Sequence, residues 1–202
     1  MGQTTPVQPP KKEGWRSVAS TVAVLLIAPL VALFLTMFVF QSYQVEGVSM
    51  FPTLNDRDRL LVWKLPRTIA KITGNHYVPN RGDIVIFATP KIEQYGQDPK
   101  KQLIKRIIAL PGERVLVKDG TITVFNADHP NGFHPDDLLP YGKTIPTTNH
   151  DTDVTVADGH VFVAGDNRPE SLDSRYFDPI SVDDIIGKLS YRVLPIDKVK
   201  SF

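Results

Sequence analysis

The run of residues from Val18 to Phe40 contains no charged side chain. Folded as an α-helix at about 1.5 Å per residue, it would extend ~35 Å, enough to cross the ~30 Å hydrocarbon core of a bilayer. Pro29 lies in the middle of the run, and membrane helices tolerate proline. The run ends in bulky aromatic residues, whereas a cleaved signal peptide has a shorter apolar core that ends in small residues. The pattern therefore predicts a retained transmembrane anchor at residues 15–41.

Charges on either side of this run predict its orientation. Lys11, Lys12 and Arg16 precede the run, and no basic residue follows it closely. Because the cytoplasmic flanks of membrane helices are enriched in lysine and arginine, we expect the N-terminus in the cytoplasm and residues 42–202 outside the plasma membrane. Residues 1–14 are rich in proline and poor in apolar side chains, so we expect a disordered cytoplasmic tail.

After the anchor the pattern changes to short apolar runs, rich in β-branched and aromatic residues and separated by turn residues. Such runs are typical of β-strands, and the Asp119-Gly120 pair between two of them predicts a hairpin. Residues 126–153 are rich in Asn, Asp, His, Pro and Gly, and we interpret them as an irregular insertion. The fold class is therefore a mainly β ectodomain after one N-terminal transmembrane α-helix. We expect strands at 59–63, 84–87, 103–109, 113–117, 121–125, 159–164 and 188–194, and a short helical turn at 181–186.

The amino-acid composition excludes several classes of function. At 202 residues the chain fits one domain with its appendages, and its formal net charge of +1 gives no support to nucleic-acid binding. The absence of cysteine excludes disulfides, thiol catalysis and cysteine-based zinc sites. The five histidines form no His-Glu-x-x-His pair, so the ligands of a zinc metalloprotease are missing. We therefore expect no metal, no other cofactor and no nucleic-acid partner.

Ser49 lies in a loop-like stretch just beyond the apolar run. A serine hydroxyl attacks a carbonyl only if a base removes its proton. Because the chain has no cysteine and none of its histidines stands out as catalytic, we expect Asp, Glu or Lys to be the base. Lys105 is our candidate, because apolar residues precede and follow it and burial lowers the pKa of a lysine. Arg106 cannot act in this way, since a guanidinium stays protonated in proteins. The alternative interpretation is a lysine that extends from an edge strand into solvent.

A further polar stretch, Gly165 to Phe177, follows a predicted strand. Within it, Asp173 and Arg175 are spaced to form a charge-assisted pair. The hydroxyl of Ser171 has the chemistry to orient an amine by hydrogen bonding. The alternative interpretation is a solvated turn without a catalytic role.

Together these stretches resemble the type I signal peptidases, the membrane-bound serine proteases that cut signal peptides from exported proteins. The resemblance covers the ectodomain, in the family's order, after an anchor in the expected place. The Ser-Met-x-Pro-Thr and Gly-Asp-Asn…Ser-x-Asp-Ser-Arg motifs are specific, whereas Arg-Gly-Asp alone would be weak. The matching segments are Gly47–Leu54, Arg81–Phe87, Ile104–Glu113 and Gly165–Phe177.

The resemblance implies that Ser49 is the nucleophile and Lys105 the general base of a serine–lysine dyad, with no metal or cofactor. It implies that the substrates are preproteins with signal peptides, that the bilayer is a partner, and that contact with the secretion translocon is to be expected. The supporting residues that it implies are Ser171, which orients the lysine, the ion pair of Asp173 and Arg175, and the loop residues Gly47, Met50 and Pro52.

Two positions depart from the family's pattern. Some members carry a serine two residues before the nucleophile, whose hydroxyl helps to stabilise the oxyanion, and this chain has Gly47 there. Single-anchor, Gram-positive-like members of the family have glycine at this position. The resemblance at Gly47 is therefore to that subtype. Asp178 stands where the family usually has glycine, which leaves the conformation of that turn open.

Two other functions remain open at this point. One is a self-cleaving regulator that uses the same serine–lysine chemistry, although residues 1–40 provide a tail and an anchor in place of a DNA-binding head. The other is a catalytically silent, membrane-anchored module for the assembly of surface proteins. Acylation of Ser49 by a penem separates the silent module from the enzymes.

Overall fold

The computed structural model describes residues 13–138, 145 and 148–202, and it divides into two compact units. The first unit ends at Met37, and the second runs from Phe38 to Phe202. Most of the tail that the sequence predicts at residues 1–14 lies outside the described residues. The last two residues of this range, Glu13 and Gly14, belong to a helix.

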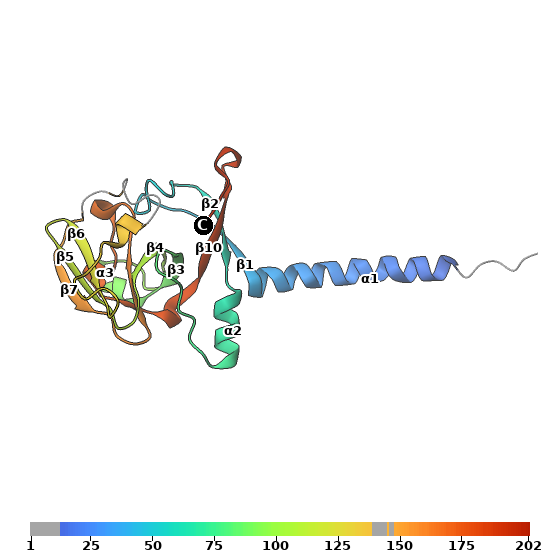
Figure 1. Cartoon of the computed structure of the whole chain (residues 1–202). Helices are drawn as coiled ribbons and strands as arrows, with labels where there is room; N and C mark the ends of the chain where they lie inside the picture. The colour runs from blue at the N-terminus through green and yellow to red at the C-terminus, as the bar shows by residue number, and fades with distance from the viewer. Residues whose placement is uncertain (1–12, 139–144, 146–147) are drawn as a thin grey trace, which may run out of the picture. The chain divides into compact units, whose positions relative to one another are not determined.

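The first unit contains α1 (Glu13–Phe34), which includes Pro29 (Figure 1). A π-helical turn at Leu35–Val39 follows α1 and includes the boundary between the two units. The stretch Ser17–Val39 has a mean hydropathy of 2.8 and is long and apolar enough to cross a membrane. The helix therefore begins two residues before the predicted anchor. It also ends earlier, because Phe40 and Gln41, placed in the anchor 15–41 by their apolar context, begin a β-strand.

The second unit is built on an eight-stranded sheet in the order β1-β2-β10-β3-β4-β8-β9, with β11 paired to β10. Neighbouring strands pair antiparallel throughout this order. A second sheet has the order β6-β5-β7 and lies on the side of the domain away from β1 and β2 (Figure 1). The strands are β1 (Phe40–Gln44), β2 (Arg59–Trp63), β3 (Ile84–Ala88), β4 (Gln102–Ala109), β5 (Arg114–Lys118), β6 (Thr121–Phe125), β7 (Thr152–Thr155), β8 (His160–Ala164), β9 (Ile180–Ser181), β10 (Ile185–Leu194) and β11 (Lys200–Ser201).

The mainly β fold predicted from the sequence is confirmed, and each predicted run contains a strand whose ends differ by up to three residues. The expected hairpin joins β5 to β6, with positive φ angles at Asp119 and Gly120 as a two-residue turn of this kind requires. The expected turn at 181–186 is a 3₁₀ turn, Val182–Asp184, and the Ser181 hydroxyl accepts a hydrogen bond from the Asp183 N–H.

Several elements were not predicted. They are the strands β1, β7, β9 and β11, the helix α2 (Leu65–Thr73) and the short helix α3 (Ser174–Phe177), together with 3₁₀ turns at Pro90–Tyr95, Pro135–Leu138, Arg168–Glu170 and Ile196–Lys198. The strand β7 takes residues 152–153 out of the predicted insertion 126–153. Residues 139–144 and 146–147 of that insertion lie outside the described residues.

Apolar packing fixes the position of β4, which runs through the middle of the domain. Ile107 belongs to a cluster of buried side chains on one face of the large sheet, together with Phe87 and Phe177. Its neighbour Ile108 points to the other face and packs with residues of β5, β6 and β8, so it joins the two sheets. A strand held from both faces has little freedom to shift, and the side chains that it carries are positioned with it.

Candidate active site

Ser49 lies in the turn that follows β1, and buried neighbours hold this turn in place. Met50 and Leu54 are almost completely buried in the cluster beneath β1 and β2. Gly47 has a φ of +90°, a conformation that favours glycine, and its N–H donates to the carboxylate of Asp56 at 2.9 Å. The turn is therefore rigid on both sides of the serine.

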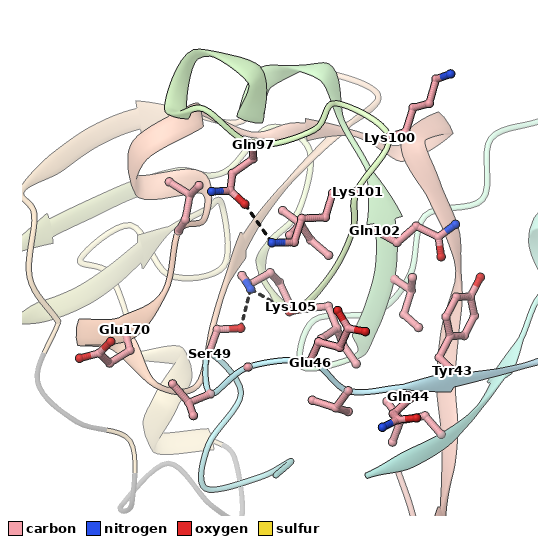
Figure 2. A pocket seen from close by; sticks show the side chains of 18 residues that line it. Tyr43, Gln44, Glu46, Ser49, Gln97, Lys100, Lys101, Gln102, Lys105 and Glu170 are labelled. Carbon is pink, nitrogen blue, oxygen red and sulfur yellow. Dashed lines mark hydrogen bonds between the residues drawn. The ribbon is translucent and has the colours of Figure 1, made fainter. Parts of the chain in front are cut away.

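Lys105 projects from β4 toward this turn (Figure 2). Its Nζ atom lies 2.8 Å from Ser49 Oγ and donates a further hydrogen bond of 3.0 Å to the Ile104 carbonyl. The side chain is only 3% exposed. The structure thus brings together the two residues that the sequence predicts as a dyad, and it excludes the alternative of a lysine that extends into solvent.

Several groups determine the charge of this amine. Burial lowers the pKa of Lys105 to about 8, the positive charges of Lys101 and Arg175 act in the same direction, and the carboxylates of Asp173 and Asp166 oppose them. With a pKa of about 8, roughly a tenth of the amines are neutral at pH 7, against fewer than about one in a thousand for an exposed lysine. An amine in this state can accept a proton from the hydroxyl 2.8 Å away.

The next residue on β4, Arg106, points to the other side of the strand and is also buried. Its guanidinium binds both carboxylate oxygens of Asp166, at 2.8 and 2.6 Å, and donates to the Gly82 carbonyl at 2.6 Å. A bidentate pair of this kind fixes orientation as well as distance. It ties β4 to the end of β8 and to the Arg-Gly-Asp turn, and the sequence analysis did not identify it.

Asp173 and Arg175 form the expected ion pair, and both side chains are fully buried. The Asp173 carboxylate also accepts a hydrogen bond of 2.6 Å from the Ser171 hydroxyl and one of 2.9 Å from the Gly165 N–H. The Ser171 hydroxyl therefore donates its hydrogen bond to Asp173. That Ser171 orients the Lys105 amine stays a prediction.

Gly165 is the point at which the serine turn and the last polar stretch meet. A Cβ atom at this position would collide with the Ser171 hydroxyl and would lie 2.5 Å from the Ser49 carbonyl oxygen. Only glycine lets the backbone approach so closely. Ser171 is thereby placed beside the main chain of Ser49, although the two residues are 122 positions apart in the sequence.

Asn167 is a site residue that the sequence analysis missed. Its backbone N–H donates to the Ser49 carbonyl at 3.0 Å, and its side-chain amide donates to the Val48 carbonyl at 3.1 Å. These two bonds clamp the serine turn onto the end of β8. The Gly-Asp-Asn sequence was noted as a motif, but nothing in a single sequence indicates which carbonyls an asparagine amide binds.

A second unpredicted pair joins the insertion to this stretch. Arg168 is buried and binds both oxygens of the Asp136 carboxylate at 2.7 Å, and it donates to the Gly165 carbonyl at 2.9 Å. Asp136, in the segment predicted as an irregular insertion, therefore holds Arg168 against the Gly165 carbonyl.

Ser49 and Lys105 line a cleft of about 560 Å³ (Figure 2). One wall is the end of β1 and the residues after it, from Tyr43 to Val48, and the other is the start of β4, from Lys101 to Ile104. Both walls have an open edge among the described residues. β1 is the last strand in the order of the large sheet, and β4 pairs with β8 only from Arg106 onward. Such edges can pair with an added extended peptide.

Comparisons with known proteins identify the family of this chain. The family model described as signal peptidase, peptidase S26, matches residues 18–194. The chain belongs to this family. Similar relatives include a probable signal peptidase I-1 of Synechocystis sp., 33% identical over 97% of this chain and 90% of the relative. A signal peptidase I of Bacillus caldolyticus is 35% identical over 86% of this chain and 87% of the relative.

A crystal structure of a signal peptidase I from Enterococcus faecalis matches 57% of this chain and 100% of that chain, at 29% identity and a TM-score of 0.43. The fold assignment rests on the strands of this chain and on membership of the signal peptidase family rather than on that likeness. Membership confirms the resemblance that the four sequence segments indicate.

Proposed function

We propose that this member of the signal peptidase family is a membrane-anchored serine endopeptidase that removes N-terminal signal peptides from exported preproteins, with Ser49 as nucleophile and Lys105 as general base. The observation that carries the proposal is the 2.8 Å contact between a buried lysine amine and a serine hydroxyl at the floor of a cleft. A catalytically silent module has no need to bury an amine against a hydroxyl, since this burial opposes stability.

The chemistry follows from these two groups. Neutral Lys105 takes the proton of Ser49 Oγ as the oxygen attacks the scissile carbonyl, and the resulting ammonium returns that proton to the leaving amine. An acyl-enzyme remains, and Lys105 then deprotonates a water molecule that hydrolyses the ester. The Ser49 backbone N–H is one donor to the oxyanion, and because Gly47 has no hydroxyl, the main chain or water supplies the other.

The walls of the cleft suggest how a preprotein binds. An extended peptide that pairs with the open edges of β1 and β4 gains main-chain hydrogen bonds whatever its sequence. Selectivity then depends on the side chains that face the walls. The family resemblance implies small residues at the first and third positions before the cut.

The proposed location is the plasma membrane, with one membrane pass. Ser17–Val39 is the candidate span, and the basic residues before it favour an orientation with the N-terminus in the cytoplasm and the catalytic unit outside. A signal peptide held in the same bilayer then presents its end to the cleft. Contact with the secretion translocon belongs to this proposal, because preproteins emerge there.

A cleavage assay tests this function. The full chain, purified in detergent and returned to vesicles, is incubated with a preprotein, and mass spectrometry identifies the new N-terminus. We expect one cut just after the signal segment. A preprotein that stays intact with the wild-type chain, under conditions in which another signal peptidase cuts it, would contradict the proposal.

The pH dependence of cleavage provides a separate prediction. Because the pKa of Lys105 is lowered to about 8 and the neutral amine is the active form, kcat/KM should rise with pH up to about 8 and then level off. Well below this value, each pH unit should reduce kcat/KM roughly tenfold. The measurement is kcat/KM for a peptide substrate without titratable groups, between pH 6 and 10. A profile that is flat from pH 6 to 8 would show that another group is the base.

A further inference from the structure

The helix α2 presents its apolar side outward. Leu65, Ile69 and Ile72 follow each other at intervals of four and three residues and so form one stripe along the helix. Ile69 is 51% exposed and Ile72 is 78% exposed. A helix on the surface of a soluble domain normally turns such a stripe toward the core, yet no residue of α2 is buried.

The polar side of α2 faces its own domain. Arg67 donates to the Asp183 carbonyl at 3.3 Å, and just after the helix His76 Nδ1 lies 3.0 Å from the Asp183 carboxylate. The helix ends in a stable manner, because Gly74 adopts a left-handed conformation and its N–H donates to the Ala70 carbonyl. The outward direction of the apolar stripe is therefore built into the fold and does not result from a frayed helix.

The start of α2 is bonded to the end of the candidate membrane span. The Lys64 N–H donates to the carbonyl of Val39, the last residue of that span, at 2.8 Å. Thr68 Oγ1 donates to the Phe38 carbonyl at 3.2 Å, and Lys64 Nζ donates to Gln41 at 3.1 Å. When the span crosses a bilayer, Lys64 and Thr68 at the start of α2 stay within hydrogen-bond distance of the residues that leave the membrane.

The residues around the stripe suit a lipid headgroup region. Residues 64–74 contain three basic side chains and no acidic one, which favours anionic phospholipids. Trp63, two residues before the helix, is 39% exposed, and tryptophan is enriched where membrane meets water. From these observations we propose that α2 lies in the bilayer interface, with Ile69 and Ile72 inserted among the lipids, and so acts as a second membrane contact that holds the catalytic domain against the bilayer.

Site-specific fluorescence in vesicles tests this proposal. The chain has no cysteine, so a single Ile72→Cys variant can be labelled with the environment-sensitive dye NBD in the full-length protein. The protein is returned to vesicles of phosphatidylcholine and phosphatidylglycerol at a ratio of about 7:3, in which some lipids carry a nitroxide near the headgroup. A matched control carries the same label at Lys118→Cys, an exposed position at the β5–β6 hairpin.

An interfacial helix inserts its apolar face about 5–10 Å, so the label at position 72 should be quenched at least about threefold more strongly than the control and should emit at shorter wavelength. Adding Ile69→Glu in the labelled variant should move both values toward the control. Labelling at Ile69→Cys repeats the test if the first variant does not fold. Quenching equal to that of the control would overturn the proposal, as would a label that is shielded from water but not quenched by the lipids, since α2 would then contact protein.

Discussion

Replacing Lys105 with methionine is expected to lower kcat/KM for preprotein cleavage by at least about 1,000-fold, because Ser49 then has no base and members of such a catalytic unit act together. Methionine keeps most of the volume of the side chain but removes the amine. Since the buried amine opposes stability, the thermal midpoint of the variant should stay equal or rise. The measurement combines cleavage kinetics with thermal unfolding in detergent.

Lys118→Met is the matched control, since it removes an exposed lysine far from the cleft in the same way. It should cleave at the wild-type rate. If the Lys105 variant retained wild-type cleavage, another group would be the base. If it lost both activity and folding, the loss would be structural, and Lys105→Ala in the same two assays would separate these outcomes.

Asp173→Ala is expected to reduce the free energy of unfolding by about 3–5 kcal/mol, because it leaves the guanidinium of Arg175 buried without its partner. It also removes the acceptor for the Ser171 hydroxyl and the Gly165 N–H, so cleavage should fall as well. Thermal and denaturant unfolding, followed by tryptophan fluorescence, measure the change.

The control is Asp153→Ala, which breaks the pair of Asp153 with Arg114. That pair has similar bidentate geometry, but each side chain is about half exposed. Solvent screens an exposed pair, so its loss should change the unfolding transition little. Equal effects of the two substitutions would mean that burial does not determine the role of Asp173.

Sequence reasoning selected the two residues of the proposed dyad by chemical type, but it could not predict that they lie in contact. Ser49 follows an apolar span, and Lys105 lies between apolar residues. The local sequence therefore indicates each residue as a candidate separately. Their 2.8 Å separation depends on the pairing of β3, β4 and β8 and on the close approach at Gly165. These contacts join residues distant in sequence, and no local pattern encodes them.

The same limit explains the missed supports. Arg106 and Asp166 are 60 residues apart in the sequence, and Arg168 and Asp136 are 32 residues apart. No sequence pattern predicts that these charges form pairs. Asp136 lies in a segment whose composition indicates only turns.

The missed elements have local causes. Only Phe40 of the strand β1 belongs to the apolar run, and the polar sequence Gln-Ser-Tyr-Gln that completes the strand gives no β pattern. The helix α2 has only nine residues and begins with Leu-Pro, which gives a weak helical pattern. The strands of the interior were predicted well because β-branched residues between turn residues form a strong local signal.

Acylation of Ser49 is the most direct test of the central claim that a neutral Lys105 activates this serine. The full chain is incubated with an acylating penem at pH 9 and at pH 6, and mass spectrometry of the digested protein locates the adduct. We expect an adduct on Ser49 that forms faster at pH 9 and is absent from the Lys105→Met variant. An adduct on another residue, or equal labelling of Ser49 in that variant, would contradict the account.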